Sequence, residues 1–382
     1  MKIFGYKKIG GIIIILVCLA IWNARDFLRI SWHQATYKGG FEHIKIGVEK
    51  DFANVESFSK FVAASGLEGA RSFIFGDRGE IYVTDSAAGK IWVLRDMDRD
   101  LIFESRQVFA ENFVAPEAIV SIDGKIYVGD KSSGKTLVFK ITDVDGDFKA
   151  DQVLPLELGL SPLVEVSFLS WLPSRKIFYV GTVSRAKDDS PKIGQILRFD
   201  LDGRTFGQIL TTPILLGSNN GFSTPVAMVE HPHTGDLIVL DRSSGREEEL
   251  NMLFENRDYG APKCFGRDWE NLCPDSIGSL YEFPLDMGIS SAVLYTGTRF
   301  PEEFGNNILM VSIGVSSGDP SLSKNIIRLN LVPFNASYDV RPSVFATGFS
   351  QPTDIEVGGE GDIYVLDAEE GEIYRIGVNY RK

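Results

Sequence analysis

The sequence has little positive charge, few histidines and few cysteines for its length. Its 382 residues include 4 histidines and 3 cysteines, and the formal net charge is −13. A surface that acidic repels nucleic acid, and no basic patch interleaved with aromatic residues is present, so we exclude nucleic acid as a partner. The sequence also contains no Ser/His/Asp arrangement, no nucleotide-binding glycine loop and no Cys-x-x-Cys motif. These absences argue against a triad hydrolase, a nucleotide-dependent enzyme and a dithiol redox protein.

The N-terminus has the features of a membrane anchor. Lys2, Lys7 and Lys8 precede an apolar run over residues 9–22, and the first acidic residue is Asp26. A positive flank held in the cytoplasm places the rest of the chain on the periplasmic or extracellular side of the membrane. The run is shorter than the roughly 20 residues that span hydrocarbon comfortably, so it also fits the apolar region of a cleaved signal peptide.

The residues around the apolar run do not form a good cleavage site. Residues 22–24 lack a small-x-small pattern, and the residues before Cys18 lack the small side chains of a lipoprotein signal. We therefore predict an uncleaved signal anchor, or transmembrane segment, at residues 1–22, followed by a stalk at residues 23–40. A cleaved signal and a buried helix are the alternatives.

Two of the three cysteines lie close together in the sequence. Cys264 and Cys273 belong to a loop rich in glycine, proline and aspartate, within an insertion at residues 259–287. Outside the cytoplasm such a pair favours a disulfide. Free thiols and a metal site are the alternatives, although a metal would need two further ligands nearby.

The decisive feature of the sequence is an internal repeat. Without gaps, residues 73–92 (FIFGDRGEIYVTDSAAGKIW) match residues 355–374 (IEVGGEGDIYVLDAEEGEIY) at glycine, I-Y-V and aspartate positions. A third copy covers residues 118–139. Weaker copies begin near Val166, Val226 and Val293. The chain therefore contains six copies of one unit.

Each copy has the pattern of a four-stranded blade. An apolar strand and a tight turn precede an I-Y-V strand that is almost wholly apolar, as expected of a strand buried on both faces. An aspartate, a Ser/Gly-rich turn and an alternating strand follow, and an outer strand precedes the next copy. We predict an all-β, six-bladed β-propeller over residues 41–382. We expect residues 43–48 to close the ring against the last blade, and residues 259–287 to form a loop at one mouth.

An ordered set of short motifs in the second half of the chain carries a family resemblance. The motifs are 226–237 (VAMVEHPHTGDL), 249–251 (ELN), 259–262 (YGAP), the cysteine pair, 295–297 (YTG), 300–301 (FP), Gly314 and 348–354 (GFSQPTD). Their order and spacing resembles the glucose/sorbosone dehydrogenase family of quinoproteins, over roughly residues 65–378. The acidic turns at residues 96–100 and 143–147 also resemble inter-blade turns of that family.

The resemblance implies a quinone-dependent sugar dehydrogenase that acts on CH–OH groups. In that family a six-bladed propeller holds pyrroloquinoline quinone (PQQ) and calcium at the mouth of a channel. A histidine accepts the proton of the sugar's anomeric hydroxyl while hydride passes to the quinone, and a base with a pKa near the working pH suits that transfer. Arginines hold the anionic quinone.

Several positions that carry this chemistry differ in this chain. The family's base position aligns with Val164, and no histidine falls there. The four histidines are His33, His43, His231 and His233, and we expect the last two to have a structural role in a blade turn. Ser223 and Thr224 replace an Arg-Asn pair, residues 313–316 replace a His-Gly-Ser-Trp run, and Ala261 replaces a tryptophan. Because these pocket positions have changed together while the scaffold residues remain, we predict impaired catalysis.

Four residues are candidates for the missing catalytic and binding roles. Glu165 neighbours the vacant base position, but strand alternation points it away from the pocket unless the register slips by one residue. Arg185, Arg242 and Arg246 follow strands and are candidates for lining the mouth. The alternative for all four is a solvated charge on the surface.

One acidic turn is a candidate metal site. Asp143, Asp145, Asp147 and Asp151 have a spacing that resembles a calcium loop, and the first three are the candidate ligands. An EF-hand, however, needs glycine at its sixth and glutamate at its twelfth position, and these positions do not match here. A solvated turn is the alternative.

Three functions are compatible with these observations. The first is a non-catalytic or altered homologue that binds a sugar, a glycan, another small molecule or a protein partner across a propeller mouth. The second is a PQQ-dependent aldose or sorbosone dehydrogenase that uses a different base, with PQQ and calcium as cofactors. The third is a structural envelope protein that docks partners through its blade edges.

Overall fold

The computed structural model describes residues 47–48, 55–132, 135–161, 163–184, 193–201, 204–205, 208–209, 214–266, 272–314 and 323–380. The chain divides into two compact units. The larger combines Lys45–Leu331 with Val340–Lys382, and the smaller combines Met1–Ile44 with Val332–Asp339. The predicted anchor and stalk lie outside the described residues. Within the described residues, no helix has the length and apolar character needed to cross a membrane.

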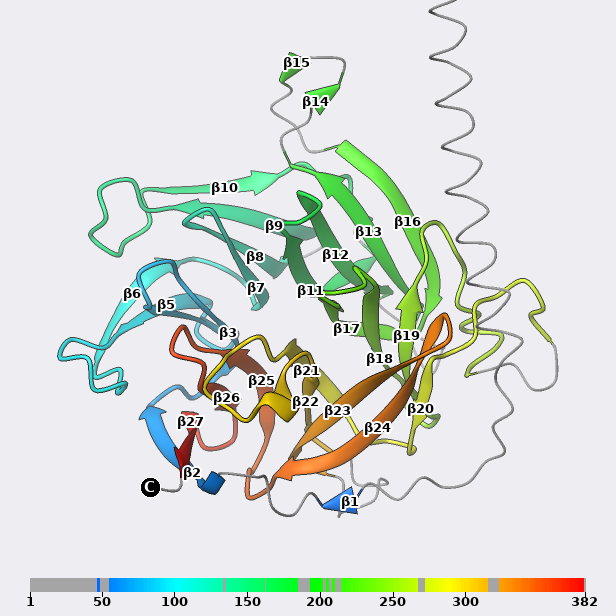
Figure 1. Cartoon of the computed structure of the whole chain (residues 1–382). Helices are drawn as coiled ribbons and strands as arrows, with labels where there is room; N and C mark the ends of the chain where they lie inside the picture. The colour runs from blue at the N-terminus through cyan, green and yellow to red at the C-terminus, as the bar shows by residue number, and fades with distance from the viewer. Residues whose placement is uncertain are drawn as a thin grey trace, which may run out of the picture. The chain divides into compact units, whose positions relative to one another are not determined.

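Six β-sheets form successive blades (Figure 1). The first blade contains β3 (Ala70–Phe75), β4 (Ile81–Asp85), β5 (Lys90–Arg95) and β6 (Ser105–Glu111). The second contains β7 (Pro116–Ile122), β8 (Lys125–Ser132), β9 (Lys135–Thr142) and β10 (Gln152–Leu156). The third contains β11 (Val164–Leu172), β12 (Ile177–Ser184), β13 (Gly194–Asp200) and β16 (Ile214–Phe222), with the short hairpin of β14 (Arg204–Thr205) and β15 (Gln208–Ile209) inserted.

The remaining three blades follow the same order. The fourth contains β17 (Thr224–Glu230), β18 (Leu237–Arg242), β19 (Glu248–Leu253) and β20 (Tyr281–Phe283). The fifth contains β21 (Ile289–Leu294), β22 (Ile308–Ser312), β23 (Asn325–Phe334) and β24 (Ser337–Ala346), with the 3-10 turn η1 (Glu302–Phe304) before β22. The sixth contains β25 (Pro352–Val357), β26 (Ile363–Asp367), β27 (Glu372–Tyr380) and, from the N-terminal side, β2 (Val55–Ala64). The prediction of an all-β, six-bladed propeller is confirmed.

The strand that closes the ring differs from the one predicted. β2 pairs antiparallel with β27 at the edge of the last blade, whereas β1 (Gly47–Val48) pairs in parallel with β24 of the fifth blade. The prediction that residues 43–48 close the last blade is therefore wrong. The longer β2 buries Phe58 against Phe300 and Phe345, with both ring-centroid distances 5.0 Å, and a two-residue strand cannot provide that packing.

The I-Y-V strands form the core between blades, as their apolar pattern predicts. Every residue of β4 (IYVTD) and β26 (IYVLD) is buried. Ile81 and Val83 of the first blade share one apolar cluster with Tyr364 and Leu366 of the last blade. Complete burial of such a side chain stabilises the fold by about 1.5–3 kcal/mol, so these strands hold neighbouring blades together.

An aspartate at or near the end of the second strand of a blade fixes the path of the chain. Asp130, Asp241 and Asp367 are buried, and each accepts hydrogen bonds from two consecutive backbone N–H groups where the first strand of its own blade begins. The donors are Val114 and Ala115, Ser223 and Thr224, and Ser350 and Gln351, at 2.6–3.1 Å. Each carboxylate thus anchors the entry into an innermost strand.

Candidate functional site

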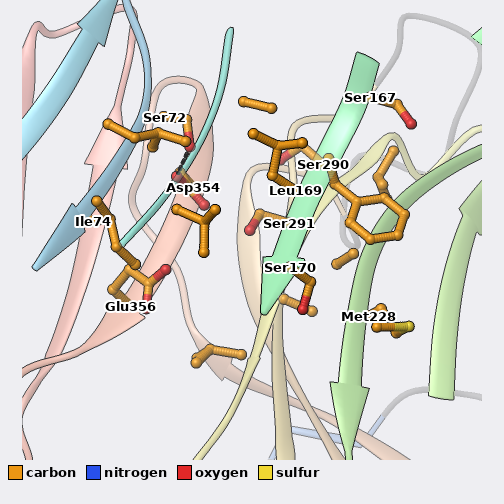
Figure 2. Close-up of a pocket in the computed structure, with 18 of the residues that line it drawn as sticks. Ser72, Ile74, Ser167, Leu169, Ser170, Met228, Ser290, Ser291, Asp354 and Glu356 are labelled. Atoms are coloured by element: carbon orange, nitrogen blue, oxygen red, sulfur yellow. Dashed lines mark hydrogen bonds between the residues drawn. The ribbon is translucent and has the colours of Figure 1, made fainter. Parts of the chain in front are cut away.

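The innermost strands of all six blades line one cavity of about 610 Å³. β3, β7, β11, β17, β21 and β25 all contribute side chains, and Figure 2 shows serines and two carboxyl groups among them. The cavity extends from Gln351, just before β25, to Leu172 and Glu230 near the far ends of β11 and β17. A volume in this range suits a small-molecule ligand.

Asp354 of β25 lies in this cavity and connects the last blade to its neighbours. Its carboxylate accepts a hydrogen bond from Ser72 Oγ at 2.5 Å (Figure 2). It also accepts one from the backbone N–H of Phe73 at 2.8 Å. The Ser291 hydroxyl is a further donor. Burial raises the pKa of Asp354, while these hydrogen bonds act in the opposite direction.

Glu356 lies two residues farther along β25 and lines the same cavity. Alternation along a strand puts residues i and i+2 on one face, which explains why both carboxyl groups reach the cavity. Burial raises the pKa of Glu356 well above its ordinary range, and the neighbouring charge of Asp354 raises it further. Burial and the closeness of the two groups therefore disfavour a negative charge on both at once.

The charge of the lining does not fit the polyanionic quinone PQQ. Its described charged residues are Arg71, Arg242, Glu117, Glu230, Asp354 and Glu356, so carboxyl groups outnumber arginines, and no histidine or lysine is among them. Quinone carboxylates need guanidinium or ammonium partners, and the two arginines are the only such groups in the described lining. The residues of this cavity therefore do not fit the cofactor.

A second group of buried carboxyl groups lies in the fourth blade. Glu248 accepts hydrogen bonds from the backbone N–H groups of Gly288, at 2.9 Å, and Ile289, at 2.8 Å, where the fifth blade begins. Burial raises the pKa of Glu248 to about 7, and the nearby charge of Arg242 acts in the opposite direction. Burial also raises the pKa of Asp241, and the charge of Glu249 adds to this effect.

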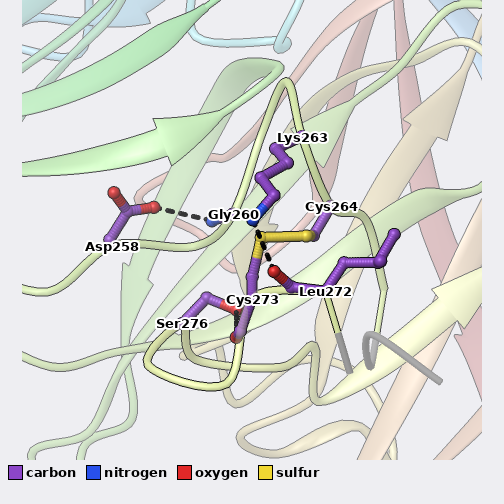
Figure 3. The surroundings of a disulfide bond; sticks show 7 residues. All are labelled: Asp258, Gly260, Lys263, Cys264, Leu272, Cys273 and Ser276. Carbon is purple, nitrogen blue, oxygen red and sulfur yellow. Dashed lines mark hydrogen bonds between the residues drawn. A yellow bond between two sulfur atoms is a disulfide. The ribbon is translucent and has the colours of Figure 1, made fainter. Parts of the chain in front are cut away.

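The cysteine pair forms the predicted disulfide. Cys264 and Cys273 are bonded with an S–S distance of 1.98 Å (Figure 3). Lys263 Nζ donates to the carbonyl of Leu272 at 2.6 Å beside the bond. The insertion belongs to the fourth blade, but it is not wholly a loop, because Tyr281–Phe283 forms β20 and pairs with β19.

The structure places the other candidate residues as follows. Glu165 pairs with Val183 and is not among the cavity-lining residues; the first lining residue of β11 is Ser167, next to a register shift between Val166 and Phe168. Arg242 lines the cavity. Arg246 is exposed and lies 4.4 Å from the Phe265 ring centroid, away from the lining. Arg185 lies outside the described residues.

The residues that replace the family's pocket positions are mostly engaged in backbone contacts. Ser223 and Thr224 are buried, do not line the cavity, and donate their backbone N–H groups to Asp241. Ala261 donates its N–H to the carbonyl of Gly221 at 2.9 Å. Ile313 lines the cavity, whereas residues 315 and 316 lie outside the described residues.

The acidic turn of the second blade gathers part of the predicted set. Carboxylate oxygens of Asp143, Asp145 and Asp151 lie within 4.8 Å of one another. Asp147 is not in this group, and it accepts the backbone N–H of Lys149 at 2.8 Å. An equivalent group in the first blade contains Asp96, Asp98 and Glu104. These turns contribute nothing to the central cavity.

Both described histidines lie in the turn between β17 and β18. His231 is buried, its backbone bonds to Asp236 and Gly235, and burial lowers its pKa. His233 Nε2 lies 3.1 Å from Asn306 Nδ2. Neither lines the central cavity, in keeping with the expected structural role.

Asp354 and Glu356 are not among the site residues that the sequence predicts. Asp354 ends the GFSQPTD motif, which belongs to the scaffold. The signal that could have found the pair is the alternation Asp354, Glu356 on the first strand of a blade, because such strands face the propeller axis.

Comparison with known proteins supports the fold. A family model described as a domain of unknown function, DUF7133, matches residues 71–163. No curated protein matched the sequence. Similar solved structures include the PQQ-bound aldose sugar dehydrogenase of Streptomyces coelicolor, with a TM-score of 0.62 and 14% identity over 86% of this chain and 100% of that chain.

Two other structures give the same result. The soluble aldose sugar dehydrogenase of Escherichia coli has a TM-score of 0.63 and 12% identity, over 85% of this chain and 100% of that one. The calcium structure of a Trichoderma reesei carbohydrate-active enzyme of family AA12 has a TM-score of 0.66 and 14% identity, over 86% of this chain and 97% of that one. The predicted resemblance to sugar dehydrogenases is thus confirmed, and at these identities it establishes the shared fold.

Proposed function

We propose that this chain is a membrane-anchored β-propeller, on the periplasmic or extracellular side, that binds a neutral sugar or the end of a glycan without oxidising it. The observation that carries the proposal is the central cavity, which combines hydroxyl groups with Asp354 and Glu356, two carboxyl groups whose pKa values are raised. The basic flank and apolar run at the N-terminus support the anchor, and the disulfide supports an oxidising compartment.

The cavity chemistry suits a ligand with many hydroxyl groups. Ser170, Ser290 and Ser291 add hydroxyl groups to the two carboxyl groups, so the wall contains both donors and acceptors. Phe168 and Trp171 of β11 add aromatic surface, on which the apolar face of a sugar ring can pack. The carboxyl groups of the cavity would repel an anionic ligand when ionised, but they do not repel a neutral sugar.

The proposal is tested by calorimetric titration of the full-length chain with glucose, galactose and sorbose. We expect saturable binding to at least one sugar, and about tenfold weaker binding after Asp354→Asn or Glu356→Gln, because each change replaces one acceptor oxygen of the wall by an NH2 donor. Glu157→Gln, at an exposed site outside the cavity, is the control. Binding that is unaffected by both cavity variants would contradict the proposal.

A second candidate is a PQQ-dependent sugar dehydrogenase with a different base, and one observation favours it. Glu356 is a cavity carboxyl group with a raised pKa, the property that suits a general base. Titration with PQQ and calcium, followed by visible absorbance and by dye reduction on aldoses, separates the two functions. Dye reduction that depends on Glu356 would establish the dehydrogenase, and the absence of any absorbance change would exclude it.

A further inference from the structure

A second cavity, of about 570 Å³, lies at the opposite end of the first blade from the strand entries that the aspartates anchor. It is bordered by the turns from β3 to β4, from β5 to β6 and from β25 to β26. In a meander of four strands these turns lie at one end, and the entries to the first strands lie at the other. We call this cavity the arginine groove; it shares no lining residue with the central cavity.

Aromatic rings form the floor of the arginine groove. Phe75 lies edge-to-face with Tyr364, with a ring-centroid distance of 5.0 Å. Phe103 lies 6.4 Å from Phe75 and 6.3 Å from Tyr364. All three line the groove, so the floor offers apolar and π surface to a flat ring.

Two arginines of the groove, Arg78 and Arg95, differ in the partners of their guanidinium groups. Arg78 lies 3.5 Å from Glu80 and 3.4 Å from Asp143, and it donates to the carbonyl of Gly146. Arg95 donates only to Ser105 Oγ, at 3.3 Å, and forms no ion pair within the described part of the chain. Its Nε is buried without a hydrogen-bond acceptor there. Because no carboxylate within the described residues pairs with it, Arg95 is the one of these two arginines whose charge an anion in the groove would neutralise.

The carboxylates around the groove already have donors of their own. Glu80 accepts from the Tyr82 hydroxyl at 3.0 Å, and Glu360 accepts from the Tyr364 hydroxyl at 2.5 Å. Asp96 accepts the backbone N–H of Leu101 at 2.8 Å. Each of these three carboxylates is therefore already stabilised by a hydrogen bond within the protein.

We propose that the arginine groove binds a small carboxylate borne on a six-membered ring, with the carboxylate on Arg95 and the ring on Phe75, which is half-buried. The planar guanidinium group matches a carboxylate in two parallel hydrogen bonds. Arg95 is held over the Phe148 ring, at 4.7 Å from its centroid, so its guanidinium group is already ordered. The volume is in the range of small-ligand sites.

The ring carboxylate can be aromatic or a sugar acid, and the test separates these sources. The full-length chain is titrated with benzoate, with glucuronate and with inorganic phosphate. We expect saturable binding of benzoate or glucuronate, with phosphate at least tenfold weaker because it gains nothing from the aromatic floor. The tighter of the two ring carboxylates identifies the class. Equal binding of phosphate would overturn the proposal.

Substitutions of Arg95 and Arg71 test whether the ligand binds in the arginine groove. Arg95→Gln should weaken binding by about tenfold or more, since a charged hydrogen bond is lost. Arg95→Lys keeps the positive charge but lacks the planar guanidinium group, so it should weaken binding less. This variant still tests the proposal if Arg95→Gln does not fold. Arg71→Gln, in the central cavity, is the matched control and should have no effect. Unchanged binding in both Arg95 variants, or a loss in Arg71→Gln, would overturn the proposal.

Discussion

Replacing Glu248 by glutamine should remove a defined part of the pH dependence of stability. Glu248 is 1% exposed, and its carboxylate holds the backbone N–H groups of Gly288 and Ile289 at the start of the fifth blade. Burial raises its pKa from 4.5 to about 7. Glutamine keeps the size of the side chain but cannot ionise, so the variant isolates the titration of this one group.

The sign of the effect follows from the direction of this pKa shift. A carboxyl group with a higher pKa in the folded chain keeps its proton on folding at pH values where the unfolded chain has lost it. Its contribution to stability is fully present below pH 4.5 and is lost as the pH rises through 7. The shift corresponds to about 3 kcal/mol in the free energy of unfolding, of which about 2.5 kcal/mol falls between roughly pH 5 and pH 8.

Urea unfolding of the wild type and of Glu248→Gln at several pH values in this window measures the effect. We expect the wild type to lose about 2.5 kcal/mol relative to the variant as the pH rises. Glu157→Gln, at an exposed position, should follow the wild type. A constant difference between the wild type and Glu248→Gln at every pH would refute the reasoning, because Glu248 would then titrate alike in the folded and unfolded chains.

Three further predictions concern stability at neutral pH, each measured by urea unfolding. Replacing Cys264 and Cys273 together by serine should cost about 2.5 kcal/mol, the chain entropy of a short closed loop, and reducing agent should then have no further effect. Asp367→Ala should cost about 3 kcal/mol, because two partly buried N–H groups lose a charged acceptor; a cost near zero would contradict its anchoring role. Gly89→Ala should cost about 2 kcal/mol or more, since Gly89 has a φ of 63° and a Cβ there would collide with the carbonyl of Phe113.

The fold could be predicted because each blade contains, within a short stretch of sequence, the pattern of its own core strand. The I-Y-V strands are buried on both faces, so their apolar runs are unbroken and recur with the same turn residues. The ring closure has no such local signal, because β2 pairs Val55 with Tyr380 at the other end of the chain. The mixed sequence VESFSKFVAA of β2 lacks the repeat motif, so its partner could not be recognised.

The candidate site was less predictable because most of its contacts join residues of different blades. The disulfide follows from two cysteines nine residues apart in one loop, which is local information. The place of Glu165 depends on the register shift between Val166 and Phe168, which the contact with the next blade determines: Ser167 Oγ donates to the carbonyl of Pro225 at 2.6 Å. Arg95 and the Phe148 ring come from different blades, so no local pattern indicates their contact.

The two proposed sites should respond to pH in opposite ways. The pKa values of Asp354 and Glu356 are raised, so both groups ionise as the pH rises, lose their donor hydrogens and come to repel each other across the cavity. Sugar binding in the central cavity should therefore weaken with rising pH. Guanidinium groups stay charged over this pH range in proteins, so binding of a ring carboxylate in the arginine groove should stay constant once the ligand is ionised. Titrations of glucose and of benzoate at acidic and at alkaline pH compare the two sites within one protein. A parallel loss of both ligands would mean that they share a site and would contradict the assignment of separate cavities.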